Sequence, residues 1–328
     1  MNLHKINNNL LINSGIITFI TLGFYFYRNY CNNSTLNTIE KNYKRNIKWE
    51  KDLEIYKIAM PKFFINGPKK KKCILLIGGY KDVPHVWNEF EKYLICNDLD
   101  FYAPRTMGNG RSFYQSVEYK DWIITYLEAI HILQDMYESI DIIGFSTGSV
   151  IALYLTQFKY NCIIDNLFLC SPFLLHDNNY IIKLFFSDNV FSKILNKLYT
   201  YTFRFHPKFF GKNNSYRDTY HKYYSKNDYC ETFGDLKMET ELFKFIKFKP
   251  KQILANNVVI LYSNDDDIIG NIYDQHTILS KIYHNPIHLI TIPSYNKYNI
   301  IQHKCGHVMF KEIDPIISDI FYNIKKYL

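Results

Sequence analysis

A serine lies between two glycines in the stretch Gly144-Phe145-Ser146-Thr147-Gly148. A short β-branched run precedes this stretch, and apolar residues at helical spacing follow it. A G-x-S-x-G pattern between a strand and a helix is typical of a sharp turn that lifts a serine hydroxyl clear of a sheet. The turn also places the hydroxyl at a helix N-terminus, where unpaired N–H groups favour negative charge. Ser146 is therefore a candidate nucleophile, and the plainer interpretation is a tight turn with an incidental serine.

Two later loops carry the groups that such a serine needs. A serine hydroxyl is a weak nucleophile unless a base takes its proton, and the base needs an orienting acid. Three acids, Asp265 to Asp267, follow the apolar stretch 258–263, and His303 and His307 follow the apolar stretch 287–293. Loops that leave the carboxyl ends of parallel strands meet at one edge of the sheet. The order serine, acid, histidine thus predicts one catalytic edge, with the choice of acid and of histidine left open.

Apolar stretches alternate along the chain with stretches of helical spacing, which defines the elements that must position these groups. Expected strands cover 73–80, 98–104, 139–143, 163–172, 256–263 and 287–293. Expected helices cover 86–94, 119–136, a stretch from 149 onward, 273–283 and 314–327. A hairpin is expected over 52–68, feeding the sheet. Because the strands are apolar on both faces, we predict an α/β fold with a mostly parallel sheet flanked by helices.

The alternation divides the chain into an N-terminal part and one main domain. It lapses over 173–250, where aromatic and basic residues mix, so we predict a helical cap inserted into a single domain over 51–328. Residues 29–50 are polar and charged, which is typical of a linker. Residues 1–28 contain an uncharged apolar stretch, Leu10 to Tyr27, about long enough to cross a bilayer as a transmembrane helix.

The charges around this apolar stretch predict its orientation. More cationic residues follow it than precede it, which favours a single-pass membrane protein with its catalytic domain in the cytosol. A cleaved signal peptide is the alternative, but the run ends without a clear small-residue cleavage site.

Composition narrows the function classes. The chain has 328 residues, 47% of them apolar and 17% aromatic, which excludes wholesale disorder. The formal charge of +8 is modest and no basic–aromatic module stands out, so we expect no nucleic-acid partner. The seven cysteines are scattered and form no C-x-x-C pair, so we expect no disulfide framework. His284 and His288 have no evident third ligand, so we expect no metal, and we expect no cofactor. Cys170 and Cys305 are interpreted as ordinary packing residues and not as nucleophiles, because neither lies on a sharp strand-to-helix turn like the one at Ser146.

In this order the motifs resemble the α/β-hydrolases, closest to the branch of monoglyceride lipases, lysophospholipases and serine aminopeptidases. The resemblance covers about 51–328. "LLIGGY" resembles the family's strand ending in His-Gly, and "FYAPRTMGNGRS" resembles its Ala-Pro-Asp-x-x-Gly-His-Gly-x-Ser loop. "LYSNDDDIIG" resembles the segment that carries the acid, and "CGHVMF" resembles the terminal Gly-His segment.

The resemblance implies a role for each matching residue. Ser146 is the implied nucleophile, Asp266 the acid and His307 the base, with Asp265, Asp267 and His303 as alternatives. The backbone N–H groups of Gly79 and Thr147 are the implied oxyanion hole.

The chain departs from the family pattern at four positions, Ile77, Arg105, Asn109 and Ser149. These departures leave substrate and subfamily open, because none of them removes a triad side chain or a backbone donor.

The expected function is that of a serine hydrolase of carboxylic esters. An apolar cap and a membrane anchor together favour a lipid or other lipophilic ester, such as a monoacylglycerol or a lysophospholipid. The alternative is an acyltransferase, or a catalytically silent binding protein, on the same fold. The oligomeric state, the acyl chain and the headgroup stay open.

Overall fold

A computed structural model describes residues 60–65, 71–80, 82–106, 109, 118–174, 190, 194, 205–207, 233–246, 249–264, 266, 269, 271–292, 309–311 and 314–328. The predicted membrane anchor, 1–28, and the predicted linker, 29–50, lie outside these residues. Within the described ranges, every helix is too short or too polar to cross a membrane.

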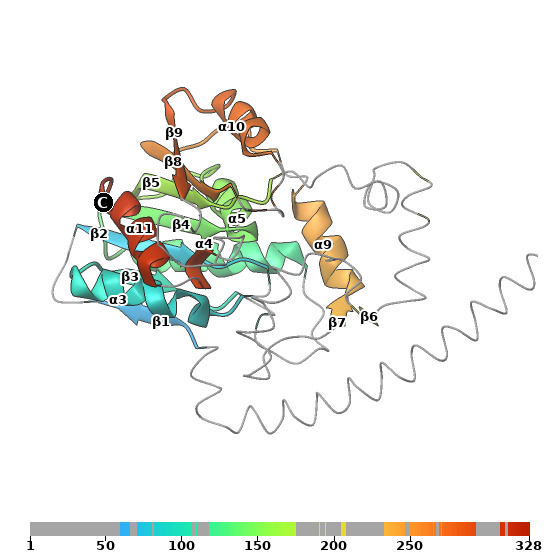
Figure 1. The fold of residues 1–328 in the computed structure, drawn as a ribbon, viewed down its shortest axis with the longest axis horizontal. Coiled ribbons are helices and arrows are strands. Elements are labelled where there is room, and N and C mark those ends of the chain that lie inside the picture. The colour runs from blue at the N-terminus through green and yellow to red at the C-terminus, as the bar shows by residue number, and fades with distance from the viewer. Residues whose placement is uncertain are drawn as a thin grey trace, which may run out of the picture.

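Among the described residues, seven strands form one sheet (Figure 1). Their order across the sheet is β1 (Lys62–Phe64), β3 (Phe101–Ala103), β2 (Lys72–Ile77), β4 (Ser139–Phe145), β5 (Ile163–Cys170), β8 (Asn257–Ser263) and β9 (Ile287–Ile292). All neighbours pair in parallel except β1, which runs antiparallel to β3. The prediction of a mostly parallel sheet is confirmed.

The first strand lies away from the strand that follows it in the chain. The expected hairpin over 52–68 lies partly outside the described residues, but its strand β1 pairs with β3 and not with β2. Both edges of β2 are taken by parallel partners, since Ile74 lies opposite Phe101 of β3 and Leu75 lies opposite Ile142 of β4. Strand β1 instead covers the outer edge of β3, where the rings of Phe64 and Phe101 stack at 6.4 Å.

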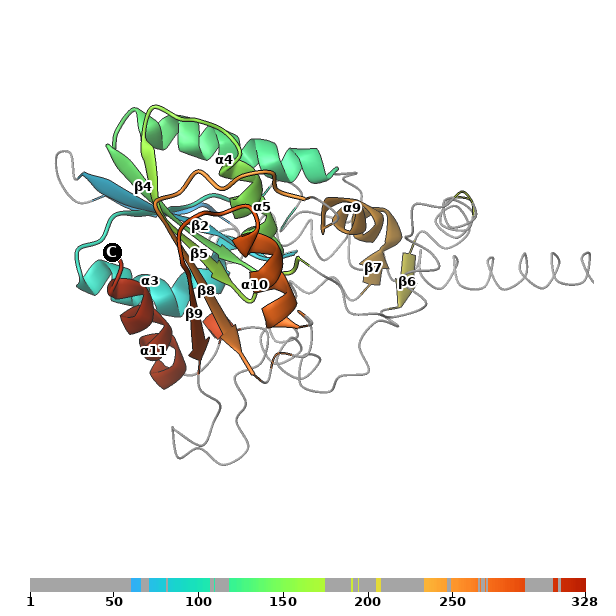
Figure 2. The same cartoon turned by 90° about the horizontal axis from the view of Figure 1, so that it is seen from above.

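Helices cover both faces of the sheet (Figure 2). One face carries the short 3-10 helix η1 (Pro84–Trp87), α3 (Asn88–Cys96), the 3-10 helix η4 (Met309–Lys311) and α11 (Asp314–Lys325). The other face carries α4 (Tyr119–Gln134), α5 (Thr147–Leu155), α9 (Leu236–Ile246) and α10 (Ile272–Ser280). The flanking helices are therefore as predicted, and most begin and end within a few residues of the expected bounds.

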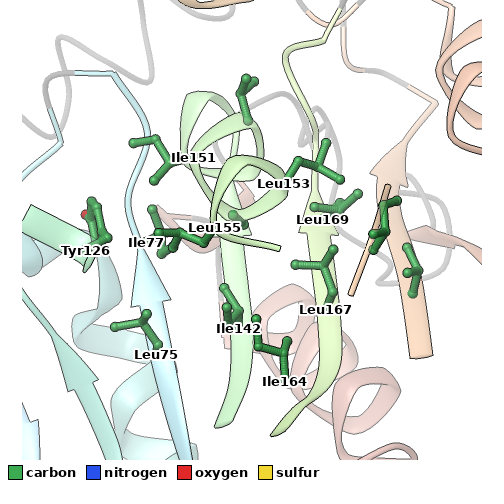
Figure 3. Packing of buried hydrophobic residues seen from close by; sticks show 14 of the residues in the cluster. Leu75, Ile77, Tyr126, Ile142, Ile151, Leu153, Leu155, Ile164, Leu167 and Leu169 are labelled. Carbon is green, nitrogen blue, oxygen red and sulfur yellow. The ribbon is translucent and has the colours of Figure 1, made fainter. Parts of the chain in front are cut away.

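Helix α5 packs into the apolar core on its own face of the sheet (Figure 3). Ile151, Leu153 and Leu155 of this helix are buried against the sheet, together with Leu167 and Leu169 of β5. Full burial of one such side chain stabilises the fold by about 1.5–3 kcal/mol. The helix that begins directly after Ser146 is thus fixed in place by packing along its length.

The described part of the insertion 173–250 contains helix α9 and also a two-stranded antiparallel sheet of β6 (Phe205–Pro207) and β7 (Phe233–Asp235). The prediction of a helical cap did not include this sheet. Helix α9 returns the chain to the main domain, because the ring of Phe245 stacks on Tyr119 at 5.5 Å and meets Trp122 edge-on at 6.3 Å.

A buried polar cluster lies at the amino ends of the central strands, away from Ser146. Asp141 Oδ1 accepts hydrogen bonds from the backbone N–H and the Nδ2 of Asn166, at 2.9 and 2.7 Å. Asp141 Oδ2 lies 3.3 Å from Lys72 Nζ, which also donates to Asp165 at 2.6 Å. Burial raises the pKa of Asp141 to about 6, because the loss of water outweighs the attraction of the Lys72 ammonium group.

Candidate active site

The order in which the chain adds strands to the sheet changes direction between β2 and β4. From β2 the chain moves to β3 on one side, and from β4 it moves through β5 and β8 to β9 on the other side. In open α/β sheets, ligands bind in the crevice outside the carboxyl ends of strands at such a switch point. Gly78 and Gly79 leave the carboxyl end of β2, and Ser146 leaves the carboxyl end of β4. Both segments thus meet at the position that favours a site.

Ser146 has a strained backbone, with φ 54° and ψ −119°. A non-glycine residue in this region costs about 1–3 kcal/mol, which the surrounding structure must offset. The Ser146 N–H donates to the carbonyl of Cys170 at 2.8 Å, and the Ser146 carbonyl accepts the N–H of Ser149 at 3.0 Å. The turn is therefore fastened to β5 on one side and to the first turn of α5 on the other.

The sharp turn around Ser146, here called the elbow (residues 144–148), requires its two glycines because other backbone atoms approach them closely. A Cβ at Gly148 would lie 2.3 Å from the Ile77 carbonyl oxygen, and a Cβ at Gly144 would lie 2.6 Å from the Gly148 carbonyl oxygen. Ser149, one of the departures from the family pattern, fastens the same turn, because its Oγ donates to the Gly144 carbonyl at 2.7 Å. The sequence spacing of glycines around Ser146 thus has a steric cause.

The two predicted oxyanion donors lie on either side of Ser146. Thr147 is the first residue of α5 and is buried, and its Oγ1 makes no hydrogen bond. A Cβ at Gly79 would lie 3.2 Å from Ser146 Cβ, so the backbone of residue 79 is next to the candidate nucleophile. The Gly79 N–H, however, donates to Asp82 Oδ2 at 3.0 Å.

The loop after β2 is held by the loop after β3. Asn109, which stands where the family has histidine, donates from Nδ2 to the Asp82 carbonyl at 2.8 Å. The hydroxyls of Thr106 and Tyr126 are hydrogen bonded at 2.7 Å, and burial raises the pKa of Tyr126. Both contacts are buried; the first ties the loop after β3 to the loop after β2, and the second ties the loop after β3 to α4.

Asp266 lies in the loop that leaves β8. Its N–H donates to the Ser263 carbonyl at 3.2 Å, and its Oδ1 accepts the Ile269 N–H at 3.3 Å, which closes a turn. Strand β5 separates β8 from β4, so the carboxyl ends of β8 and β4, which lead to Asp266 and Ser146, lie at the same end of the sheet, two strand spacings or roughly 10 Å apart. The alternative acids, Asp265 and Asp267, lie outside the described residues.

His307 and the alternative base His303 lie outside the described residues. The chain is described again from Met309, and the buried ring of Phe310 lies 5.6 Å from the ring of Phe145. Three residues of chain span at most about 11 Å, so the position of Phe310 limits how far His307 can lie from it.

The other candidates that the sequence offered have ordinary surroundings. Cys170 is fully buried, and burial raises the pKa of its thiol, which disfavours a nucleophilic thiolate. Cys305 lies outside the described residues. His288 packs on the ring of Tyr327 at 5.3 Å. The described residues hold no group of three or more histidines, cysteines and acids that could bind a metal ion.

Sequence reasoning missed Asp82, which is 8% exposed and contacts a predicted oxyanion donor. The available signal was an acid three residues after the paired glycines at a strand end. That signal is weak, because nothing in the local pattern shows that the acid turns back onto Gly79.

No family model matches the sequence, and no curated protein matches it. Solved structures do resemble it. A monoacylglycerol lipase from Paleococcus ferrophilus is 13% identical with a TM-score of 0.56, over 82% of this chain and 98% of that chain. A soluble variant of monoglyceride lipase from Saccharomyces cerevisiae, in complex with a substrate analog, is 13% identical with a TM-score of 0.53, over 81% of this chain and 90% of that one. The alpha/beta hydrolase domain-containing protein 10 from mouse is 14% identical with a TM-score of 0.53, over 82% and 98%. Identities this low show likeness of fold and nothing finer.

Proposed function

The chain has the α/β-hydrolase fold, and from that premise we propose that it is a serine hydrolase of carboxylic esters. One observation carries the proposal: Ser146 sits on a strained turn at the carboxyl end of β4, beside Gly79 and at the N-terminus of α5. A strained backbone that persists at a switch point is typical of a functional residue.

In the proposed mechanism, Ser146 attacks the acyl carbonyl while His307 takes the hydroxyl proton. Asp266 holds the imidazole in the correct tautomer and stabilises its charged form. The backbone N–H groups of Thr147 and Gly79 receive the oxyanion, and the loss of one such donor typically costs about 3 kcal/mol. His307 then gives its proton to the leaving alcohol, and water activated by the same histidine releases the acyl group.

Chain connectivity supports the proposed partners of Ser146. Asp266 follows the end of β8 by three residues and lies at the same sheet edge as Ser146. Phe310 packs against Phe145, and only three residues separate Phe310 from His307. An acid, a histidine and a serine in these positions can form the usual hydrogen-bonded series.

We further propose a lipophilic ester as the substrate. Tyr80, directly after Gly79, meets Trp122 edge-on at 6.0 Å, and Trp122 meets Phe245 of α9 at 6.3 Å. Tyr154 of α5 lies 6.5 Å from the same Phe245 ring. These rings form one aromatic cluster that packs the segment after β2 against the end of the cap insertion, and a cap built on apolar packing beside the candidate site favours an acyl chain over a polar group.

The N-terminal segment is proposed as a single-pass membrane anchor, with the catalytic domain in the cytosol. Its support is the uncharged stretch Leu10 to Tyr27 and the cationic residues after it. Deletion of residues 1–40 is expected to move the protein from the membrane fraction to the soluble fraction while hydrolysis of short-chain esters continues. Membrane association that survives the deletion contradicts the anchor.

Hydrolysis of p-nitrophenyl esters tests the enzymatic proposal. Esters of increasing acyl length are offered to the wild type, to Ser146→Ala and to Ser280→Ala, a matched control on the exposed face of α10. We expect Ser146→Ala to lose activity and Ser280→Ala to retain it, with a preference for longer acyl chains. Hydrolysis that survives in Ser146→Ala rejects the mechanism, and product analysis with added alcohols separates hydrolysis from acyl transfer.

A further inference from the structure

The Asp82 carboxylate lies at the predicted oxyanion hole. Its Oδ2 accepts the Gly79 N–H at 3.0 Å, which is the bond that the proposed mechanism reserves for the substrate oxygen. The same Oδ2 lies 2.9 Å from the point where a Cβ at residue 79 would sit, and Ser146 Cβ lies 3.2 Å from that point. The carboxylate and the Ser146 side chain thus both lie close to the backbone of Gly79.

An N–H group directed at a carboxylate oxygen cannot at the same time stabilise an oxyanion well. Hydrogen bonds to charged acceptors are stronger than those between neutral groups, so the Gly79–Asp82 bond competes with the transition state for the donor. A fixed negative charge beside the developing oxyanion also opposes it. Asp82 is buried, which reduces the screening of that charge by water.

We propose that Asp82 is a positioning residue that occupies the Gly79 donor in the free protein and must release it for acyl transfer. The inference rests on the proposed serine hydrolase function. The oxyanion hole is then complete only when the Asp82 carboxylate turns away, and the position of this side chain sets the rate of acylation.

Two hydrogen bonds of residue 82 do not involve its carboxylate, which makes the proposal testable by substitution. The backbone N–H of Asp82 donates to the Gly79 carbonyl at 3.1 Å, and the backbone carbonyl of Asp82 accepts Asn109 Nδ2 at 2.8 Å. Both bonds use backbone atoms of residue 82. Asp82→Ala therefore removes the competing acceptor and leaves these two backbone bonds in place, and Asp82→Asn removes the charge while keeping the size of the side chain.

The first measurement is the rate of acylation of Ser146. A fluorophosphonate probe and the pre-steady-state burst of p-nitrophenol are followed in the full chain, in both Asp82 variants and in Asp274→Ala, which removes an exposed acid on α10. We expect Asp82→Ala to acylate about tenfold faster than the wild type with little change in KM, and Asp82→Asn to gain less. The control is expected to match the wild type. An Asp82→Ala rate equal to or below the wild-type rate overturns the proposal, because a merely supporting carboxylate gives that result.

The second measurement reports the hydrogen bond independently of catalysis. In protein labelled with ¹⁵N-glycine, the Gly79 amide proton is expected to move upfield and exchange faster in both Asp82 variants, and not in Asp274→Ala. An unmoved Gly79 resonance overturns the proposal even where activity changes. If the resonance moves but no variant is labelled at Ser146, the serine hydrolase function fails and the positioning role fails with it. The melting temperature of each variant confirms that it is folded.

Discussion

The ring of Phe310 lies 5.6 Å from the ring of Phe145 in an edge-to-face contact. Phe145 directly precedes Ser146, and Phe310 follows His307 by three residues. The Phe310 ring also lies 4.5 Å from Trp87. One aromatic core therefore anchors both the end of the strand that leads to the candidate nucleophile and the described segment that begins two residues after the candidate base.

His307 is the proposed base, and His303 lies four residues further from this contact along the chain. His307→Ala is expected to lower kcat by about 10⁴-fold or more, because the serine then has no group to take its proton. His303→Ala, the matched control, is expected to keep kcat within about threefold, since a substitution that removes no catalytic group has small effects. Steady-state kinetics on a p-nitrophenyl ester checks both, and a larger loss in His303→Ala would exchange the two roles.

A single acid is expected to orient that histidine. Asp266→Asn keeps the size of the side chain but holds the imidazole in the wrong tautomer, which is expected to lower kcat by about 10⁴-fold. Asp265→Asn and Asp267→Asn are expected to lie within about threefold of the wild type. The same ester assay compares the three variants, and a greater loss at either neighbour would assign the acid to that residue.

The local patterns of the sequence predicted the elements of this fold well. Leu75, Ile142 and Leu167 lie in mostly apolar runs, and each run is a strand that is largely buried. The sharp turn at Ser146 could be predicted equally well from the sequence, because the spacing of its glycines is itself a recognisable pattern. The structure gives the reason for that spacing, which is close contact within the turn and with β2.

Contacts between distant segments could not be predicted in the same way. Asp141 was read as part of an apolar strand, yet it pairs with Asn166 and Lys72 from two neighbouring strands. The bond from Gly79 to Asp82 depends on how a loop turns back, and periodicity carries no information on that turn. The position of β1 beside β3 likewise depends on which strand has an unpaired side for it to bind.

Gly148, the second residue of α5, is expected to resist substitution. A Cβ in Gly148→Ala would lie 2.3 Å from the Ile77 carbonyl oxygen and 2.5 Å from the Gly78 carbonyl oxygen. Backbone cannot move away cheaply, so we expect a loss of about 2–3 kcal/mol in the free energy of unfolding, although alanine favours the helix by about 1 kcal/mol. Urea denaturation measures this loss.

Gly78→Ala is the matched control for that substitution. Its nearest contact would be Asp82 Cβ at 3.2 Å, followed by a Val86 methyl group at 3.7 Å, so side chains and not backbone must give way. We expect a loss below about 1 kcal/mol. Equal losses in the two variants would contradict the steric account of the elbow.

The buried carboxyl of Asp141 is expected to make stability depend on pH. Its pKa is about 6 in the folded protein against an ordinary value of 3.8, so the folded state binds the proton more tightly than the unfolded state. The resulting stabilisation is fully present below pH 3.8 and is lost as the pH rises through 6. Between pH 7 and pH 5 the wild type is expected to gain about 1 kcal/mol relative to Asp141→Asn.

Urea denaturation at both pH values checks this difference. Asp274→Asn, an exposed acid on α10, serves as the control and is expected to change little relative to the wild type between the two pH values. A difference between wild type and Asp141→Asn that stays constant from pH 7 to pH 5 would show that burial does not raise the pKa of this carboxyl.

The account rests on an activated hydroxyl at residue 146, and covalent labelling of the full chain with a fluorophosphonate, followed by mass spectrometry of the digested protein, measures that activation directly. We predict one adduct, on Ser146, which forms at least about a thousandfold more slowly in His307→Ala. An adduct on another residue, no adduct on the folded wild type, or labelling of Ser146 at an unchanged rate in His307→Ala would contradict the account.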